Sequence, residues 1–196
     1  MLTSIARPDD SEFAPYYATY INMAAAALSA STLTDISALL AGQNDELETL
    51  LKGVTDDEAN RAYAAGKWTL KESLVHVFDA ERVFTYRAAC IARGDKAAFP
   101  SFDQDAYVPE SRANARSLSN ILAEFRAIRL ATLALLRSFD AAALAQIGTA
   151  SGQPVTPRAL CWIIAGHAAH HMTITRERYL AHELGSHELV SEQNQV

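Results

Sequence analysis

Apolar residues recur every three or four positions in four long segments of this chain, which is the spacing of an amphipathic helix. These segments are about 33–52, 69–94, 118–139 and 156–182, with a shorter one near 16–27. No strand-like alternation competes with this pattern, although 147–157 has the residues of a small hairpin. Alanine and leucine are abundant while glycine (8) and proline (6) are sparse, which also favours helices. The sequence therefore predicts an all-α fold built on four long helices.

Capping residues mark the start of two of these helices. Thr69 and Glu72 have the spacing of a capping box, in which the hydroxyl and the carboxylate each satisfy a free backbone N–H. Thr156 precedes Pro157, and proline is favoured at the first position of a helix because it has no N–H to leave unsatisfied. We therefore expect the second and fourth helices to begin at these positions.

Length, charge and hydropathy exclude several classes of protein. The 196 residues suit one domain, 1–196, with a core of about 13–182 and a frayed tail at 185–196. The net charge of −6 argues against nucleic-acid binding, because phosphate contacts need a clustered cationic face. No window approaches the roughly 20 apolar residues of a membrane span, and the start of the chain turns acidic where a secretory signal would be apolar. The two cysteines, Cys90 and Cys161, lie in apolar helical contexts that favour buried free thiols. We therefore expect a cytoplasmic protein.

Three of the six histidines fall within five residues of the fourth helix. His167 and His171 are four residues apart, so their imidazoles project from one face and can reach one metal ion. The glutamate of an HExxH protease motif is absent, and a catalytic metal site needs a third protein ligand. His76 on the second helix is the best candidate, whereas His170 projects away and His182 and His187 lie near the tail. The alternative is that these are ordinary core or surface histidines, because a lone pair at this spacing also arises by chance.

An acidic residue on the second helix has two interpretations. Asp79 lies three residues after His76 and nearly shares its face, so it could orient a metal ligand or act as a base. The alternative, which we prefer, is that Asp79 and Glu81 are solvated or form ion pairs with Arg82 and Arg176. The residues alone leave both interpretations open.

The connection between the second and third helices, 94–116, is much longer than a tight antiparallel hairpin needs. A connection of this length can return along the bundle, so that the two helices run parallel. It carries three aromatic residues and two acids, namely Phe99, Phe102, Tyr107, Asp103 and Asp105. Because aromatic side chains need burial, we expect the connection to pack over one end of the bundle close to the metal, with Asp103 or Asp105 as a polar anchor.

Three stretches, in their order and spacing, resemble the DinB-like superfamily of metal-binding four-helix bundles. They are GKWTLKESLVHVFDAERVFTYRAACIARGD, FDQDAYV and ALCWIIAGHAAHHMTITRERYL. The resemblance extends over about 13–180 and implies an up-down-down-up bundle with a long crossover between the second and third helices. It also implies a divalent ion, most often zinc or nickel, bound by His76, His167 and His171.

The resemblance implies more than one class of function. Some relatives are thiol-dependent transferases or isomerases that use bacillithiol or mycothiol, and their metal lowers the pKa of the thiol. Others are described as metal-dependent hydrolases, and a non-catalytic metal-binding or structural bundle is the third alternative. We place a thiol S-transferase slightly ahead of a hydrolase, because hydrolysis needs a base and Asp79 would have to reach the site to supply it. The expected partners are a small-molecule substrate, such as a low-molecular-weight thiol, and a second copy of the chain.

Overall fold

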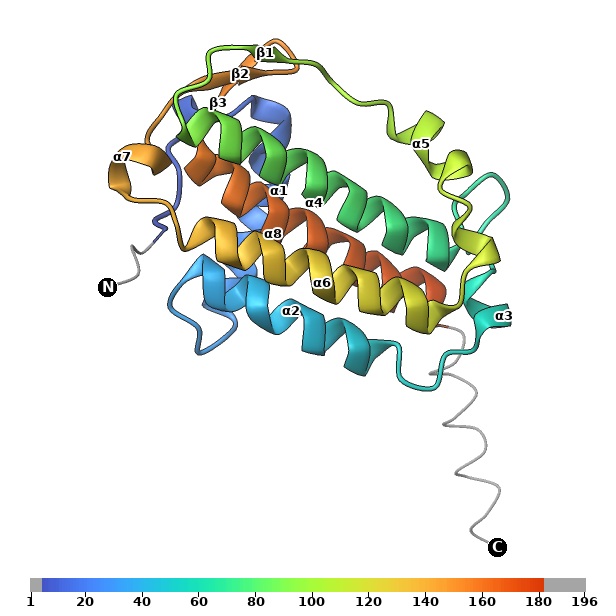
Figure 1. Ribbon diagram of the computed structural model, residues 1–196. Coiled ribbons are helices and arrows are strands. Elements are labelled where there is room, and N and C mark those ends of the chain that lie inside the picture. The colour runs from blue at the N-terminus through green and yellow to red at the C-terminus, as the bar shows by residue number, and fades with distance from the viewer. Residues whose placement is uncertain (1–4, 182–196) are drawn as a thin grey trace, which may run out of the picture.

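The computed structural model describes residues 5–181 and shows a bundle of four long helices (Figure 1). These are α2 Ile36–Leu50, α4 Leu70–Ala92, α6 Leu118–Leu136 and α8 Pro157–Ile174, which continues into a π-helical turn, Thr175–Tyr179. The predicted all-α fold and all four long helices are confirmed. The predicted frayed tail, together with His182 and His187, lies outside the described residues.

The bundle has the predicted up-down-down-up topology. In Figure 1, α2 and α8 run in one direction, while α4 and α6 run in the other. The two parallel helices are joined by a connection that returns along the length of α4. It contains β1 Ala98–Phe99, α5 Gln104–Glu110 and a short 3₁₀ turn, Ala113–Ala115. The long crossover is therefore what allows α4 and α6 to lie parallel.

The predicted helix starts are confirmed. The Thr69 side chain accepts a hydrogen bond from the backbone N–H of Glu72, whose carboxylate accepts one from the N–H of Thr69 in return. Thr156 accepts from the N–H of Ala159, and Pro157 occupies the first turn of α8. These local bonds fix where α4 and α8 begin, and thus the height of each histidine along its helix.

The crossover follows the prediction except at one aromatic residue. Asp103 is the expected polar anchor, since its carboxylate caps α5 by accepting from the backbone N–H groups of Asp105 and Ala106. Phe99 is buried and Phe102 half-buried, but Tyr107 is 52% exposed, contrary to the expectation that it would be buried. Tyr107 projects from the solvent side of α5, and its ring packs against the ring of Phe102, with 5.6 Å between ring centroids.

A small sheet covers the end of the bundle opposite α5 (Figure 1). Strands β2 Gly148–Ala150 and β3 Gln153–Val155 form the predicted hairpin, with Ser151 and Gly152 at positive φ in its turn. The pairing of β1 parallel to β2 was not predicted, because it joins residues about fifty positions apart. The remaining short elements are 3₁₀ turns Asp10–Glu12 and Pro15–Tyr17, α3 Asp56–Ala59 and α7 Ala141–Leu144.

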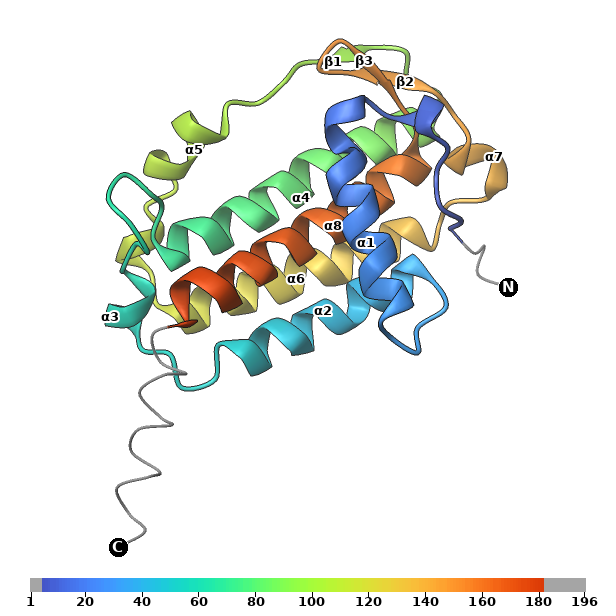
Figure 2. The ribbon, with the colours of Figure 1, turned by 180° about the vertical axis from the view of Figure 1, so that it is seen from behind.

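The predicted short N-terminal helix is α1, Ala18–Ser29, which crosses α8 on the far side of the bundle (Figure 2). The two helices approach closely at Gly166, where a Cβ atom would lie 1.8 Å from the backbone oxygen of Tyr20. A contact with backbone cannot be relieved by a change of rotamer. Glycine at this position therefore lets α1 pack directly beside the first histidine of α8.

Replacing Gly166 with alanine is expected to lower the free energy of unfolding by about 2 kcal/mol or more, because α1 must move away from α8. Urea denaturation measures the loss. Gly42 is the matched control, since it lies on the exposed face of α2, where an added Cβ atom would have nothing within 4 Å. Gly42→Ala should raise stability by roughly 0.5–1 kcal/mol through helix propensity. Equal effects of the two substitutions would contradict the close-packing argument.

A buried ion pair and the hydrogen bonds around it connect the four long helices. Arg129 of α6 is fully buried and donates to both carboxylate oxygens of Glu81 on α4. It also donates to the side chain of Gln43 on α2, whose amide in turn donates to the backbone oxygen of Ala165 on α8. The predicted partners of Glu81 were wrong, because Glu81 faces the core rather than the solvent side of α4. Arg176, the other expected partner, instead pairs with Glu46 at 3.2 Å.

Two further expectations concern the cysteines and the membrane. Cys90 and Cys161 are free thiols as predicted, and Cys161 is buried, but Cys90 is only half-buried, contrary to the expectation that both would be buried. None of the helices in the described part of the chain is both long and apolar enough to span a membrane.

Candidate metal centre

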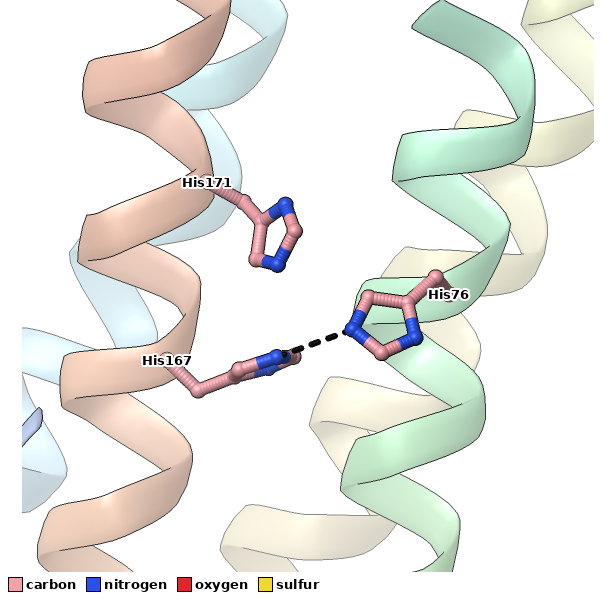
Figure 3. A group of neighbouring side chains, drawn as sticks. All are labelled: His76, His167 and His171. Carbon is pink, nitrogen blue, oxygen red and sulfur yellow. Dashed lines mark hydrogen bonds between the residues drawn. The ribbon is translucent and has the colours of Figure 1, made fainter. Parts of the chain in front are cut away.

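Three histidines from two neighbouring helices point toward one another (Figure 3). His76 lies in the second turn of α4, and His167 and His171 lie one turn apart on α8. The Nε2 atoms of His76 and His167 are 3.1 Å apart, and one ring nitrogen from each of the three residues lies within 4.8 Å of the others. The structure therefore brings together the three residues predicted as metal ligands.

Aromatic side chains enclose this histidine cluster on two sides. The ring of Tyr20, from α1, packs edge-on against His167 with 5.2 Å between centroids, and Phe84 packs against the same imidazole at 6.1 Å. Trp68 packs against His76 at 4.9 Å. Just before a helix, an apolar residue often packs against an apolar side chain in the first turn, which is called a hydrophobic staple. Trp68 does not form one, because the residue at that position of α4 is the polar Ser73. Trp68 therefore forms part of the site.

A hydroxyl group orients the third imidazole. The Oγ of Ser73 lies 3.1 Å from Nδ1 of His171, within hydrogen-bonding distance. Ser73 precedes His76 by three residues, so both side chains project from the same face of α4. A hydrogen bond at Nδ1 fixes the rotation of the ring and directs Nε2 toward the other two histidines. The spacing of Ser73 and His76 is the sequence signal that could have identified this residue.

Burial lowers the pKa of all three imidazoles. Desolvation takes the pKa of His76 to about 4, while the carboxylate of Asp105 acts in the opposite direction. Desolvation takes the pKa of His171 to about 3, and desolvation together with the neighbouring imidazoles holds the pKa of His167 well below its usual value. The three rings are therefore neutral at pH 7, and each has an unprotonated nitrogen that can bind a metal ion.

The donor set fits a divalent metal ion of the zinc or nickel type. Two nitrogens bound tetrahedrally at about 2.0–2.1 Å from zinc lie roughly 3.4 Å apart, close to the 3.1 Å between His76 and His167. Imidazole is a preferred ligand of zinc, nickel and copper, and three protein ligands are the number found in catalytic zinc sites. The residues are thus suitable in chemistry, protonation and spacing.

The comparisons with known proteins give the family and the fold of the chain. The family model of the DinB superfamily matches residues 39–174, which include all three histidines. The chain belongs to the DinB superfamily. No match was found among curated proteins. Among solved structures, the chain is similar to YfiT from Bacillus subtilis, described as a probable metal-dependent hydrolase with an unusual four-helix bundle topology. The TM-score is 0.66 and the identity 17%, over 92% of this chain and 94% of YfiT, which supports the same fold.

Two other predicted residues of this DinB superfamily member do not converge with the three histidines, although the ring of His170 lies 5.3 Å from that of His171 between centroids. His170 is half-buried and contacts the ring of Tyr20, with 5.7 Å between centroids, and it is not one of the three converging histidines. The carboxylate of Asp79 accepts a hydrogen bond of 2.8 Å from Arg82, which also pairs with Glu124. Burial raises the pKa of Asp79, and Arg82 opposes this shift. Within residues 5–181 Asp79 forms no hydrogen bond to an imidazole, so the observed contact is the ion pair.

A cavity of about 270 Å³ gives access to the histidine cluster from solvent. It lies between the loop before α4, helix α5 and the C-terminal end of α8, and His171 and Ser73 form part of its wall. A void on the core side of His171 measures only about 10 Å³, which is room for at most one water molecule. A substrate would therefore approach His171 from the α5 side, and α5 lies close to the cluster as predicted for the crossover.

Proposed function

We propose that this chain is a metal-dependent enzyme that acts on a small molecule bound beside His171. The observation that carries the proposal is a cluster of three neutral imidazoles of which one, His171, lines a solvent-open cavity. A purely structural metal site is closed by four protein ligands, whereas a catalytic site keeps an open position. His76 and His167 are buried, but His171 lines the cavity, which supports the catalytic alternative.

The residues of the chain hold and orient the reacting groups. His76, His167 and His171 would bind the divalent ion, which when bound supplies positive charge that stabilises a hydroxide or thiolate anion beside it. Because all three ligands are neutral, they leave the charge of the ion undiminished. Trp68 and Tyr20 exclude water from the sides of the cluster, so the field of that charge is poorly screened.

Transfer of a thiol is the reaction that the arrangement supports best. No carboxylate in the described part of the chain hydrogen-bonds to the three imidazoles, and Asp79 is held by Arg82. Hydrolysis needs a base that accepts a proton from water, whereas a thiolate is already a nucleophile. We therefore infer a thiol S-transferase acting on a low-molecular-weight thiol and an electrophilic substrate.

Hydrolysis is the second candidate, favoured by one residue of the cavity. Asp105 is exposed on α5, lines the same cavity as His171 and interacts electrostatically with His76. Its carboxylate could accept a proton from water in the cavity. The description of YfiT as a probable metal-dependent hydrolase supports this alternative by likeness of fold.

Substituting His167 with alanine is expected to weaken zinc binding by about a hundredfold or more, because it removes one of three ligands. Titration of the metal-free protein with zinc, in competition with a chromophoric chelator, measures the affinity. His170→Ala is the matched control, since this neighbouring histidine does not converge on the cluster. If the two variants bind zinc equally well, the ligand assignment is wrong.

Experiments on the cobalt-substituted protein distinguish thiol transfer from hydrolysis. Titration with small thiols should produce a sulfur-to-metal charge-transfer band if thiol transfer is the function. If no thiol changes the spectrum, while ester or amide hydrolysis is present and is lost in His76→Ala, the hydrolase is the correct candidate. If neither occurs, the site is not catalytic for either class of substrate.

A further inference from the structure

The cavity beside His171 presents two side chains of opposite charge. Lys67 comes from the loop before α4 and Asp105 from α5, so they approach from separate segments of the chain. Within residues 5–181 neither side chain takes part in an ion pair or a side-chain hydrogen bond with another side chain. Both charged groups are therefore available to a bound molecule.

The rest of the wall suits a small molecule with an apolar body. Trp68 and Tyr179 contribute aromatic surface, and Ile174 contributes an aliphatic one. The Tyr179 hydroxyl donates a 2.7 Å hydrogen bond to the backbone oxygen of Trp68, which ties the loop before α4 to the end of α8. Tyr179 closes the π-helical turn that follows α8, and such turns are frequent at functional sites. The cavity wall is therefore built from segments that are held to one another.

We propose that this cavity binds a small zwitterion of about the size of an amino acid, with Lys67 contacting its carboxylate and Asp105 its ammonium group. The aromatic side chains in the wall of the same cavity also favour a cationic group. The volume of about 270 Å³ suits a compound of this size. The proposal rests on the proposed function only in placing the reacting group of the ligand beside His171. Binding itself depends on Lys67 and Asp105 and needs no metal.

Three compounds with the same short thiol skeleton test the proposal. Cysteine carries both charged groups, cysteamine only the ammonium and 3-mercaptopropionate only the carboxylate. The chain has two tryptophans, so the indole N–H resonance of Trp68 can be followed by NMR in the metal-free protein. Cysteine is expected to bind about tenfold more tightly than either of the other two, which is the usual effect of one charge-assisted hydrogen bond.

Two exposed substitutions separate the roles of the charges. Lys67→Met should remove the advantage of cysteine over cysteamine, and Asp105→Asn should remove its advantage over 3-mercaptopropionate. Lys96→Met, an exposed lysine before β1 at the far end of the bundle, should leave the ranking unchanged. Equal binding of the three compounds, no saturable binding of cysteine, or an unchanged ranking in the Lys67 and Asp105 variants would each overturn the proposal.

The test of zwitterion binding is independent of the proposed reaction. A zwitterion preference in the metal-free protein, without a charge-transfer band in the cobalt protein, would support the cavity assignment and reject thiol transfer. If all three thiols produce the charge-transfer band with equal affinity and cysteine is not preferred, thiol transfer is supported and the cavity assignment is rejected. The two hypotheses therefore fail separately.

Discussion

Replacing Arg129 with methionine is expected to lower the free energy of unfolding by about 3–5 kcal/mol, because it leaves the carboxylate of Glu81 buried without its cation. Glu81 is only 2% exposed, and Arg129 donates to it at 3.0 and 2.9 Å. After the substitution, the hydroxyl of Thr132, at 2.6 Å, would be the hydrogen-bond partner that Glu81 retains. Urea denaturation at pH 7 measures the loss.

Two further variants test whether the loss of folding stability comes from an unpaired buried charge. Arg129→Met combined with Glu81→Met should recover part of the stability, since replacing both partners of a buried pair costs less than removing one. Arg126→Met removes a cation from the exposed pair with Glu48 and should change stability by less than about 1 kcal/mol. If Arg126→Met and Arg129→Met are equally destabilising, burial does not govern the effect.

These two arginines also show where sequence reasoning reaches its limit. Arg126 and Arg129 are three residues apart on α6, and arginine is a residue type that usually lies on the solvated side of a helix. Arg126 is about half exposed, whereas Arg129 is fully buried. The sequence indicates the buried face of a helix by its apolar residues, so it does not distinguish an arginine within that face from one beside it. The partner of Arg129 is 48 residues away, so only the tertiary structure reveals it.

The parts of the site that the sequence predicts are those with a local signal. His167 and His171 share a face because of the geometry of one helix, and the capping box at Thr69 sets the height of His76 on another. Tyr20 and Trp68, in contrast, contact the imidazoles through the packing of α1 and of the loop before α4. No periodicity connects those segments to the histidines, so their role could not be predicted.

Lowering the pH from 7 to 5 is expected to destabilise the metal-free protein by about 1–2 kcal/mol for each of His76 and His167. Both imidazoles are less than a tenth exposed and neutral in the folded state, because desolvation depresses the pKa of His76 to about 4 and holds that of His167 well below its usual value. In the unfolded chain their pKa is about 6.5. The unfolded state therefore binds more protons below pH 6.5, and stability is lost as the pH falls from there toward the folded-state pKa values. Urea denaturation at several pH values measures this dependence.

The comparison that isolates these two residues is the double variant His76→Gln with His167→Gln. Glutamine is polar but does not titrate, so the variant should lose stability at pH 7 yet show a shallower dependence between pH 7 and 5. Carboxylates elsewhere in the chain titrate equally in both proteins and cancel in the difference. An identical slope in the parent and the double variant would mean that the folded protein admits protons to the cluster as readily as the unfolded chain does. The neutral donor set that makes the three histidines suitable for a metal ion would then be lost at mildly acidic pH.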